Sequence, residues 1–132
     1  MFISFTYHLT HLYRISPYLA IFENIRSRTA LDFESAFTTV AVMEGSSDRV
    51  HIDANDHGVT WVLPLGDWKG AKFVIPQLKL EIDVLPGQLL GFSANFLAHY
   101  CTPVTSGRRI VITMFTCRNV FFDSVMFYKL GG

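Results

Sequence analysis

From Ala36 onward, apolar and β-branched residues come in short runs separated by residues that favour turns. The runs are Phe37–Met43, Arg49–Asp53, Val59–Leu65, Lys72–Ile75, Leu78–Ile82, Leu89–Phe92, Leu97–Thr102 and Arg109–Cys117. The breaks between them are Glu44–Asp48, Asn55–Gly58, Gly66–Gly70, Pro76, Pro86–Gly87 and Ser106–Gly107. About eight short strands at such regular spacing predict an all-β sandwich or barrel. The last stretch, Val120–Leu130, is rich in aromatic residues and predicts a further strand, as a sheet edge or a swapped arm.

The N-terminal segment, residues 1–34, has a different pattern. Leu19, Phe22 and Ile25 form an apolar stripe at helical spacing, and Pro17 interrupts the segment before it. The sequence therefore predicts a mainly β protein with an N-terminal helix. We expect one domain over residues 1–132, with the helical segment at 1–34, the β core at 36–121 and a C-terminal tail at 122–132.

Composition and charge exclude few classes of function. The 132 residues carry eleven basic and eleven acidic side chains, so the net charge gives no general attraction to a polyanion. No carboxylate occurs between Asp83 and Asp123, a span that contains three arginines, so a small anion would be favoured there. Two cysteines are too few for a disulfide framework and indicate a reducing compartment. We expect no signal peptide, no membrane span and no membrane partner, because the apolar N-terminus is interrupted by charged residues and proline.

Candidate metal chemistry begins with the short motif His51-Ile52-Asp53. Side chains two residues apart on a strand project from the same face, so this imidazole and carboxylate can chelate one ion. His99 is the candidate for a third ligand from a distant strand, although a histidine on an apolar strand can also be a core residue. Two histidines and one carboxylate form the facial triad of non-haem Fe(II) oxygenases, which leaves coordination positions open.

An arginine pair strengthens this interpretation. Arg108 and Arg109 follow His99 by nine and ten residues, and a guanidinium suits the far carboxylate of an iron-chelating 2-oxoglutarate. Because the two side chains face opposite sides of a strand, only one of them can take this role. The hydrophobic pattern around the pair does not separate them.

Together these residues resemble the catalytic core of the Fe(II)/2-oxoglutarate-dependent dioxygenase superfamily, over about two-thirds of the chain. The ordered set is His51-x-Asp53, Leu65-Gly66-Asp67, Lys69-Gly70, Phe73–Pro76, Pro86-Gly87, His99, Thr102-Pro103-Val104, Gly107 and Arg109. The resemblance implies a double-stranded β-helix (a jelly-roll, cupin-like fold), with iron at His51, Asp53 and His99, O2 as co-substrate, and 2-oxoglutarate at Arg109. It also implies a hydroxyl contact to 2-oxoglutarate from Thr113 or Thr60.

Within the superfamily, the sequence is most similar to the TET/J-binding-protein branch, which oxidises the methyl group of 5-methylpyrimidines in nucleic acid. This resemblance assigns Asp56 to the exocyclic amine of a flipped base and Phe115 to stacking on that base. Cys117 stands where some relatives place a histidine near the base. The implied partner is DNA with a flipped methylated base, and the implied location is intracellular, in the nucleus.

Two alternatives stay open. A prolyl-hydroxylase-like oxygenase of protein side chains would fit the segment from His99 to Arg109 almost as well. A non-catalytic cupin-like binding module, as a truncated or degenerate paralogue, would fit the short N-terminal part and the absence of a basic stripe for phosphates. The sequence leaves the natural substrate and the oligomeric state undetermined.

Overall fold

The computed structural model describes residues 37–130, and the predicted helical segment at 1–34 lies outside them. Residues 40–115 form one compact unit, and the flanking described residues belong to a second unit. We describe each unit by itself.

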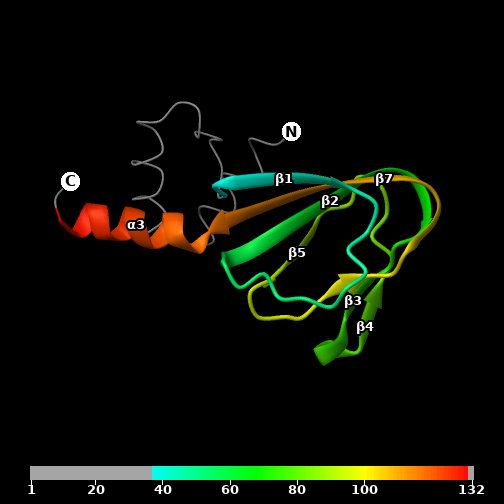
Figure 1. Ribbon diagram of the computed structural model, residues 1–132, viewed down its shortest axis with the longest axis horizontal. Helices are drawn as coiled ribbons and strands as arrows, with labels where there is room; N and C mark the ends of the chain where they lie inside the picture. Colours follow the sequence, from blue (N-terminus) through cyan, green and yellow to red (C-terminus); the bar gives the residue numbers. More distant parts are fainter. Residues whose placement is uncertain (1–36, 131–132) are drawn as a thin grey trace. The chain divides into compact units, whose positions relative to one another are not determined.

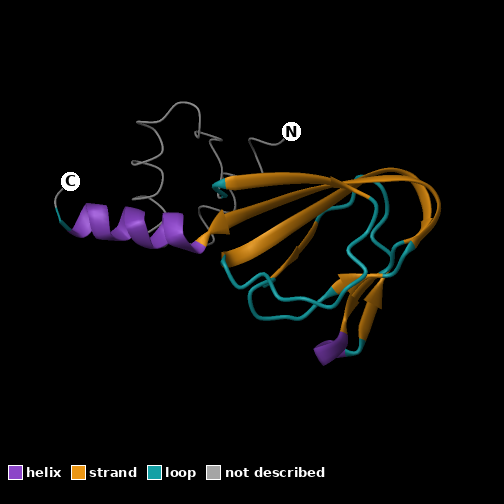
Figure 2. Ribbon diagram, viewed as in Figure 1, coloured by secondary structure: helices purple, strands orange, loops and turns teal. Residues whose placement is uncertain are grey.

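Two antiparallel sheets build the unit of residues 40–115 (Figures 1 and 2). The larger sheet has the order β1-β7-β2-β5, formed by β1 (Thr39–Glu44), β7 (Val104–Cys117), β2 (Asp56–Gly70) and β5 (Leu90–Phe92). The smaller sheet has the order β4-β3-β6, formed by β4 (Leu80–Ile82), β3 (Phe73–Ile75) and β6 (Tyr100–Cys101). A 3₁₀ turn, η2 (Pro76–Leu78), joins β3 to β4. This arrangement confirms the predicted mainly β, jelly-roll architecture.

The core of this unit lies among apolar side chains of both sheets. Val62 and Val111 are buried on β2 and β7, while Phe73 is buried on β3. Phe73 meets Phe92 of β5 edge to face, with ring centroids 4.8 Å apart, which is a favoured aromatic geometry. Along β2, burial alternates through Thr60, Val62 and Pro64, as expected for a strand with one face toward the core. The apolar run predicted at Val59–Leu65 is thus a strand, with one face buried.

Three of the predicted chain breaks are wrong in whole or in part. Gly66–Gly70 and Ser106–Gly107 lie inside the long strands β2 and β7, and most of Asn55–Gly58 belongs to the start of β2. Gly107 has a φ of +82°, and a Cβ there would collide with the backbone carbonyl oxygen of Asp67. Gly66 has a φ of +116°, and a Cβ there would collide with the carbonyl oxygen of Arg108. These glycines let two paired strands approach closely while they bend, so they mark irregular strand positions rather than turns.

The strand predicted at Arg49–Asp53 is also wrong. Within that range only His51 pairs, through one isolated antiparallel bridge to His99. The chain between β1 and β2 is otherwise irregular. This segment is too short and too polar to pair along its whole length with a neighbouring strand. Its one paired residue, His51, is a predicted metal ligand.

A third correction concerns the C-terminus, where the predicted strand Val120–Leu130 is the helix α3 (Arg118–Lys129). Phe121 is buried and Val125 is half-buried, whereas Asp123 between them is exposed. A strand would place all three on one face, but a helix separates Asp123 from the other two. Its aromatic composition misled the strand prediction, since a short apolar run fits either period. No helix in residues 37–130 is long and apolar enough to cross a membrane.

Candidate metal centre and adjoining cavity

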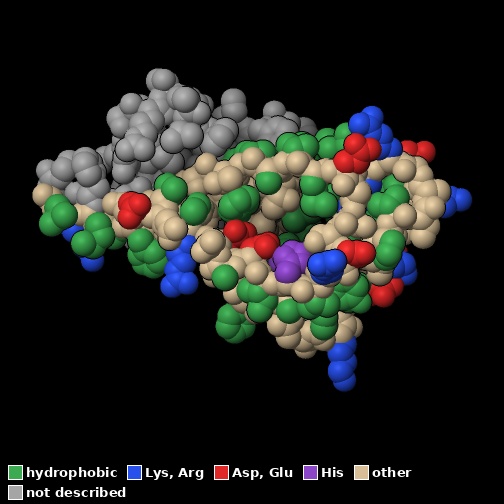
Figure 3. Space-filling view, in the orientation of Figure 1, with side chains coloured by type: hydrophobic (Ala, Val, Ile, Leu, Met, Phe, Trp, Pro, Cys, Tyr) green, Lys and Arg blue, Asp and Glu red, His purple; other side chains and the backbone are tan. Residues whose placement is uncertain are grey.

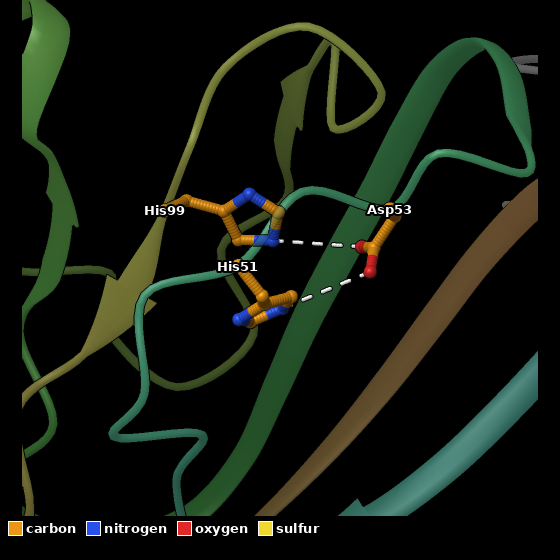
Figure 4. Close-up of side chains that lie close together, drawn as sticks. All are labelled: His51, Asp53 and His99. Carbon is orange, nitrogen blue, oxygen red and sulfur yellow. Dashed lines mark ion pairs between the residues drawn. The ribbon is translucent and has the colours of Figure 1, made fainter.

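Three predicted ligands come together in the unit of residues 40–115 (Figure 4). His51 Nε2 lies 3.7 Å from Asp53 Oδ1, and His99 Nε2 lies 3.5 Å from Asp53 Oδ2. One ligand atom from each residue lies within 4.8 Å of the other two. Two imidazole nitrogens and one carboxylate are a donor set suited to Fe(II) and similar ions. These side chains could therefore hold one metal ion.

The backbone keeps the two histidines adjacent. The amide of His51 donates to the carbonyl of His99 at 3.1 Å, and the amide of His99 donates to the carbonyl of His51 at 3.0 Å. The amide of Asp53 donates to the carbonyl of Ala94 at 2.9 Å. Residues that are distant in sequence are thus fixed side by side by main-chain hydrogen bonds, independently of their side chains.

Each imidazole is also oriented by its second nitrogen. His51 Nδ1 lies 2.8 Å from the carbonyl oxygen of Arg49, and His99 Nδ1 lies 2.9 Å from that of Leu97. A carbonyl oxygen only accepts, so Nδ1 carries a proton in both rings, and in the neutral form of each ring Nε2 is left as a lone-pair donor. Metal-binding histidines are commonly held in this way. The tautomers required for metal binding are therefore set by the backbone.

Aromatic rings hold the buried His99. Its ring stacks on Phe73 at a centroid distance of 5.7 Å and meets Phe92 edge to face at 4.7 Å. His99 is only 6% exposed, whereas the His51 side chain is 34% exposed. The metal-ligand group is therefore buried on the side of His99 and accessible to solvent on the side of His51.

The charges of Asp53 and His99 support each other. The long hydrogen-bonding contact from His99 lowers the pKa of Asp53, and this effect exceeds the opposing effect of burial. Burial lowers the pKa of His99, but the interaction with Asp53 and the hydrogen bond to Leu97 outweigh it and raise that pKa. Asp53 is thus kept ionised, as a metal ligand must be.

The metal-ligand group opens into a cavity of about 280 Å³. Figure 3 shows a hollow on this face, with acidic and histidine side chains at its rim. The cavity is lined by His51, Asp53 and His99 at one part and by Arg109, Thr113 and Phe115 of β7 at another. A volume of this size suits a small molecule or one unit of a polymer.

The structure distinguishes the two neighbouring arginines. Arg109 is 3% exposed and lines the cavity. Its Nη1 donates to the carbonyl of Gly45 at 2.9 Å, while its Nε has no acceptor. Arg108 is exposed and forms a two-pronged ion pair with Glu44, at 2.8 and 3.3 Å.

Burying a guanidinium without a counter-ion is costly. Among residues 37–130, no carboxylate lies within ion-pair distance of Arg109. Its orphaned Nε and its place on the cavity wall fit an anionic group that would enter from solution. Arg108 is already paired with Glu44 and does not line the cavity, so it needs no anion from solution.

The predicted substrate residues fall into two groups. Asp56 is buried at the start of β2 and accepts a hydrogen bond from Thr60 at 2.5 Å, and both residues line the cavity together with Phe115. Burial raises the pKa of Asp56, and this effect exceeds the opposing effect of the Thr60 hydrogen bond. Cys117 belongs to the second compact unit, where its amide donates to Thr38 Oγ1 at 3.0 Å, so its proposed place near a base stays a prediction.

Cys101 is a cavity residue to which the sequence reasoning gave no role in the site. It lines the cavity, and its sulfur lies 3.9 Å from Nη2 of Arg109. Burial raises the pKa of its thiol, although Arg109 acts in the opposite direction. The available signal was its position two residues after His99, because strand alternation puts both on one face.

Comparison with known proteins adds information at the level of the fold. No protein-family model matches the sequence, and no curated protein is significantly similar to it. The solved structure of NgTET1 in complex with 5mC DNA matches 96% of this chain at 16% identity, with a TM-score of 0.65. An oxidoreductase of the 2OG-Fe(II) oxygenase family from Burkholderia pseudomallei matches 62% of the chain at 22% identity, with a TM-score of 0.53.

A viral collagen prolyl hydroxylase from Paramecium Bursaria Chlorella virus-1 also aligns, at 18% identity over 70% of this chain and 65% of its own. Its TM-score is 0.45. The present chain spans 56% of the NgTET1 chain and 43% of the Burkholderia chain. The chain therefore has the double-stranded β-helix fold that these 2-oxoglutarate- and Fe(II)-dependent oxygenases share, which confirms the resemblance at the level of the fold.

Proposed function

We propose that this protein is an Fe(II)- and 2-oxoglutarate-dependent dioxygenase. The observation that carries the proposal is one cavity lined by both the group of His51, Asp53 and His99 and the buried Arg109. A metal chelate and a guanidinium in one cavity suit the two ends of a small keto dicarboxylate. The fold shared with NgTET1 and the Burkholderia oxidoreductase supports this assignment.

In this proposal the chain's own residues bind and orient the reactants. His51, Asp53 and His99 would hold iron, which together with O2 supplies the oxidising chemistry when bound. Arg109 would pair with the far carboxylate of 2-oxoglutarate, and the Thr113 hydroxyl would donate a hydrogen bond to it. Thr60 is a weaker candidate for this contact, because its hydroxyl already donates to Asp56. The largely apolar lining of the cavity, which includes Val62, Phe73 and Phe92, would lower the local dielectric constant and strengthen these charged contacts.

For the substrate, we propose a 5-methylpyrimidine base of nucleic acid, oxidised at its methyl group. A cavity of about 280 Å³ admits one base but not a duplex, so the base would have to be flipped out of the stack. Asp56 would accept a hydrogen bond from the exocyclic amine, and Phe115 would stack on the ring, both from the cavity wall. This substrate would imply a nuclear location.

Hydroxylation of a protein side chain is the second candidate. The equal numbers of basic and acidic residues favour it, because duplex binding normally requires a basic stripe along the phosphates. The two candidates differ in which polymer stimulates succinate release.

The test measures iron content and succinate release on the purified chain. We expect one iron per chain, 2-oxoglutarate consumption, and stimulation by an oligonucleotide containing 5-methylcytosine but not by a proline-rich peptide. Peptide stimulation instead would support the second candidate, and iron binding without turnover would support a binding module. Elemental analysis of His51→Ala and Asp53→Ala should show iron loss, whereas His57→Ala, outside the group, should retain iron. Normal iron content in either ligand variant would refute the assignment.

A further inference from the structure

The cavity contains a nucleophile that the proposed reaction does not use. Cys101 lies on β6, is 8% exposed, and is a free cysteine. It lines the same cavity as the metal-ligand group and Arg109. A thiol on the wall of a small-molecule cavity can meet any ligand that enters it.

The neighbouring Arg109 indicates that a ligand close to this thiol would be an anion. Nη2 of Arg109 lies 3.9 Å from Cys101 Sγ, and Arg109 is only 3% exposed, with no acceptor for its Nε. No carboxylate of the described residues pairs with it. A carboxylate from solution that hydrogen-bonds this guanidinium therefore brings its neighbouring carbon atoms close to the thiol.

We propose that Cys101 is a covalent modification site for α,β-unsaturated dicarboxylates captured by Arg109. The sulfur forms a bond to one alkene carbon, the C=C π bond breaks, and the thiol proton ends on the other alkene carbon. The product is a thioether, and the addition needs no oxidant or other reactant. The adduct occupies the cavity and blocks the 2-oxoglutarate site, so the inference rests on the anion subsite of the proposed function.

The second cysteine is a built-in control. Cys117 is more exposed than Cys101 and lies in the other compact unit. A reagent without a carboxylate should follow exposure and react first at Cys117. A dicarboxylate held by Arg109 should react first at Cys101, because binding converts a collision into a reaction between neighbours.

The experiment treats the full chain with fumarate and maps adducts on both cysteines by peptide mass spectrometry. We expect fumarate to modify Cys101 at least ~10-fold faster than Cys117, a modest share of what proximity can supply. Iodoacetamide, the uncharged control reagent, should reverse this order. Excess 2-oxoglutarate should slow the fumarate reaction at Cys101 only.

Two variants sharpen the result. Arg109→Met should abolish the fumarate preference for Cys101, while Arg108→Met, whose side chain is exposed and paired with Glu44, should keep it. Equal fumarate rates at both cysteines, or an unchanged preference in Arg109→Met, would overturn the proposal. If 2-oxoglutarate binds in calorimetry but fumarate leaves Cys101 unmodified, the covalent site is wrong and the proposed function stands. If neither dicarboxylate binds, the co-substrate site of the proposed function is wrong as well.

Discussion

Replacing each of the two neighbouring arginines by methionine separates their roles. Arg109→Met keeps most of the side-chain volume, removes the buried charge, and leaves the Gly45 carbonyl without its donor. A hydrogen bond to a charged group contributes about 1.5–3 kcal/mol. Since each 1.4 kcal/mol is roughly a tenfold change in Kd, loss of one such contact should weaken 2-oxoglutarate binding about 10- to 150-fold.

Arg108→Met should leave that Kd unchanged, because its partner Glu44 is on the surface and neither residue lines the cavity. The measurement is isothermal titration of 2-oxoglutarate into each variant, loaded with Mn(II) to avoid turnover. Thermal melts of both variants check that the fold is retained. Equal weakening in the two variants, or none in Arg109→Met, would refute the reasoning.

Two further predictions concern stability. Gly107→Ala and Gly87→Ala share a positive φ, at +82° and +79°, but only the first places its Cβ against a backbone carbonyl, that of Asp67. Gly87→Ala should lower the free energy of unfolding by about 1 kcal/mol, because only the positive φ opposes the new side chain. Gly107→Ala should lower it by about 2–4 kcal/mol, because hydrogen bonds between the strands are lost as well. Urea unfolding measures both values, and similar values for the two variants would argue against a close approach of the strands at Gly107. Asp56→Asn should stabilise the protein at neutral pH. The raised pKa of Asp56 means that its protonated form stabilises the fold below the ordinary value of 3.8, and that this stability is lost as the pH rises through the folded-state value. The neutral asparagine avoids that loss. That gain should disappear below pH 3.8, and a gain independent of pH in thermal melts would contradict it.

The sequence predicted the fold class and the metal-ligand group better than the strand boundaries. The apolar run Val59–Leu65 indicated a strand in β2, but not which of its faces is buried, because almost every residue of the run is apolar. The spacing of His51 and Asp53 placed both side chains together even though the strand expected there did not form. Side-chain direction survived because it depends on extended backbone, not on a complete ladder.

Other features required the three-dimensional contacts. The residue pattern alone left Arg108 and Arg109 equivalent, and only the resemblance favoured Arg109. The physical reason is the ion pair of Arg108 with Glu44, a residue far away in sequence. Gly66 and Gly107 looked like turns because only the paired strand opposite each one explains why no side chain fits. The helix at residues 118–129 was missed because aromatic residues at ambiguous spacing fit either a strand or a helix.

The two reciprocal main-chain hydrogen bonds between His51 and His99 hold the candidate metal ligands together without help from distant loops. Both imidazoles stay in register as long as these bonds persist, whatever happens to the length or chemistry of surface loops elsewhere in the chain. Under the proposed function, a lineage with such a centre would acquire new substrates by exchanging those loops, with no need to rebuild the metal site each time.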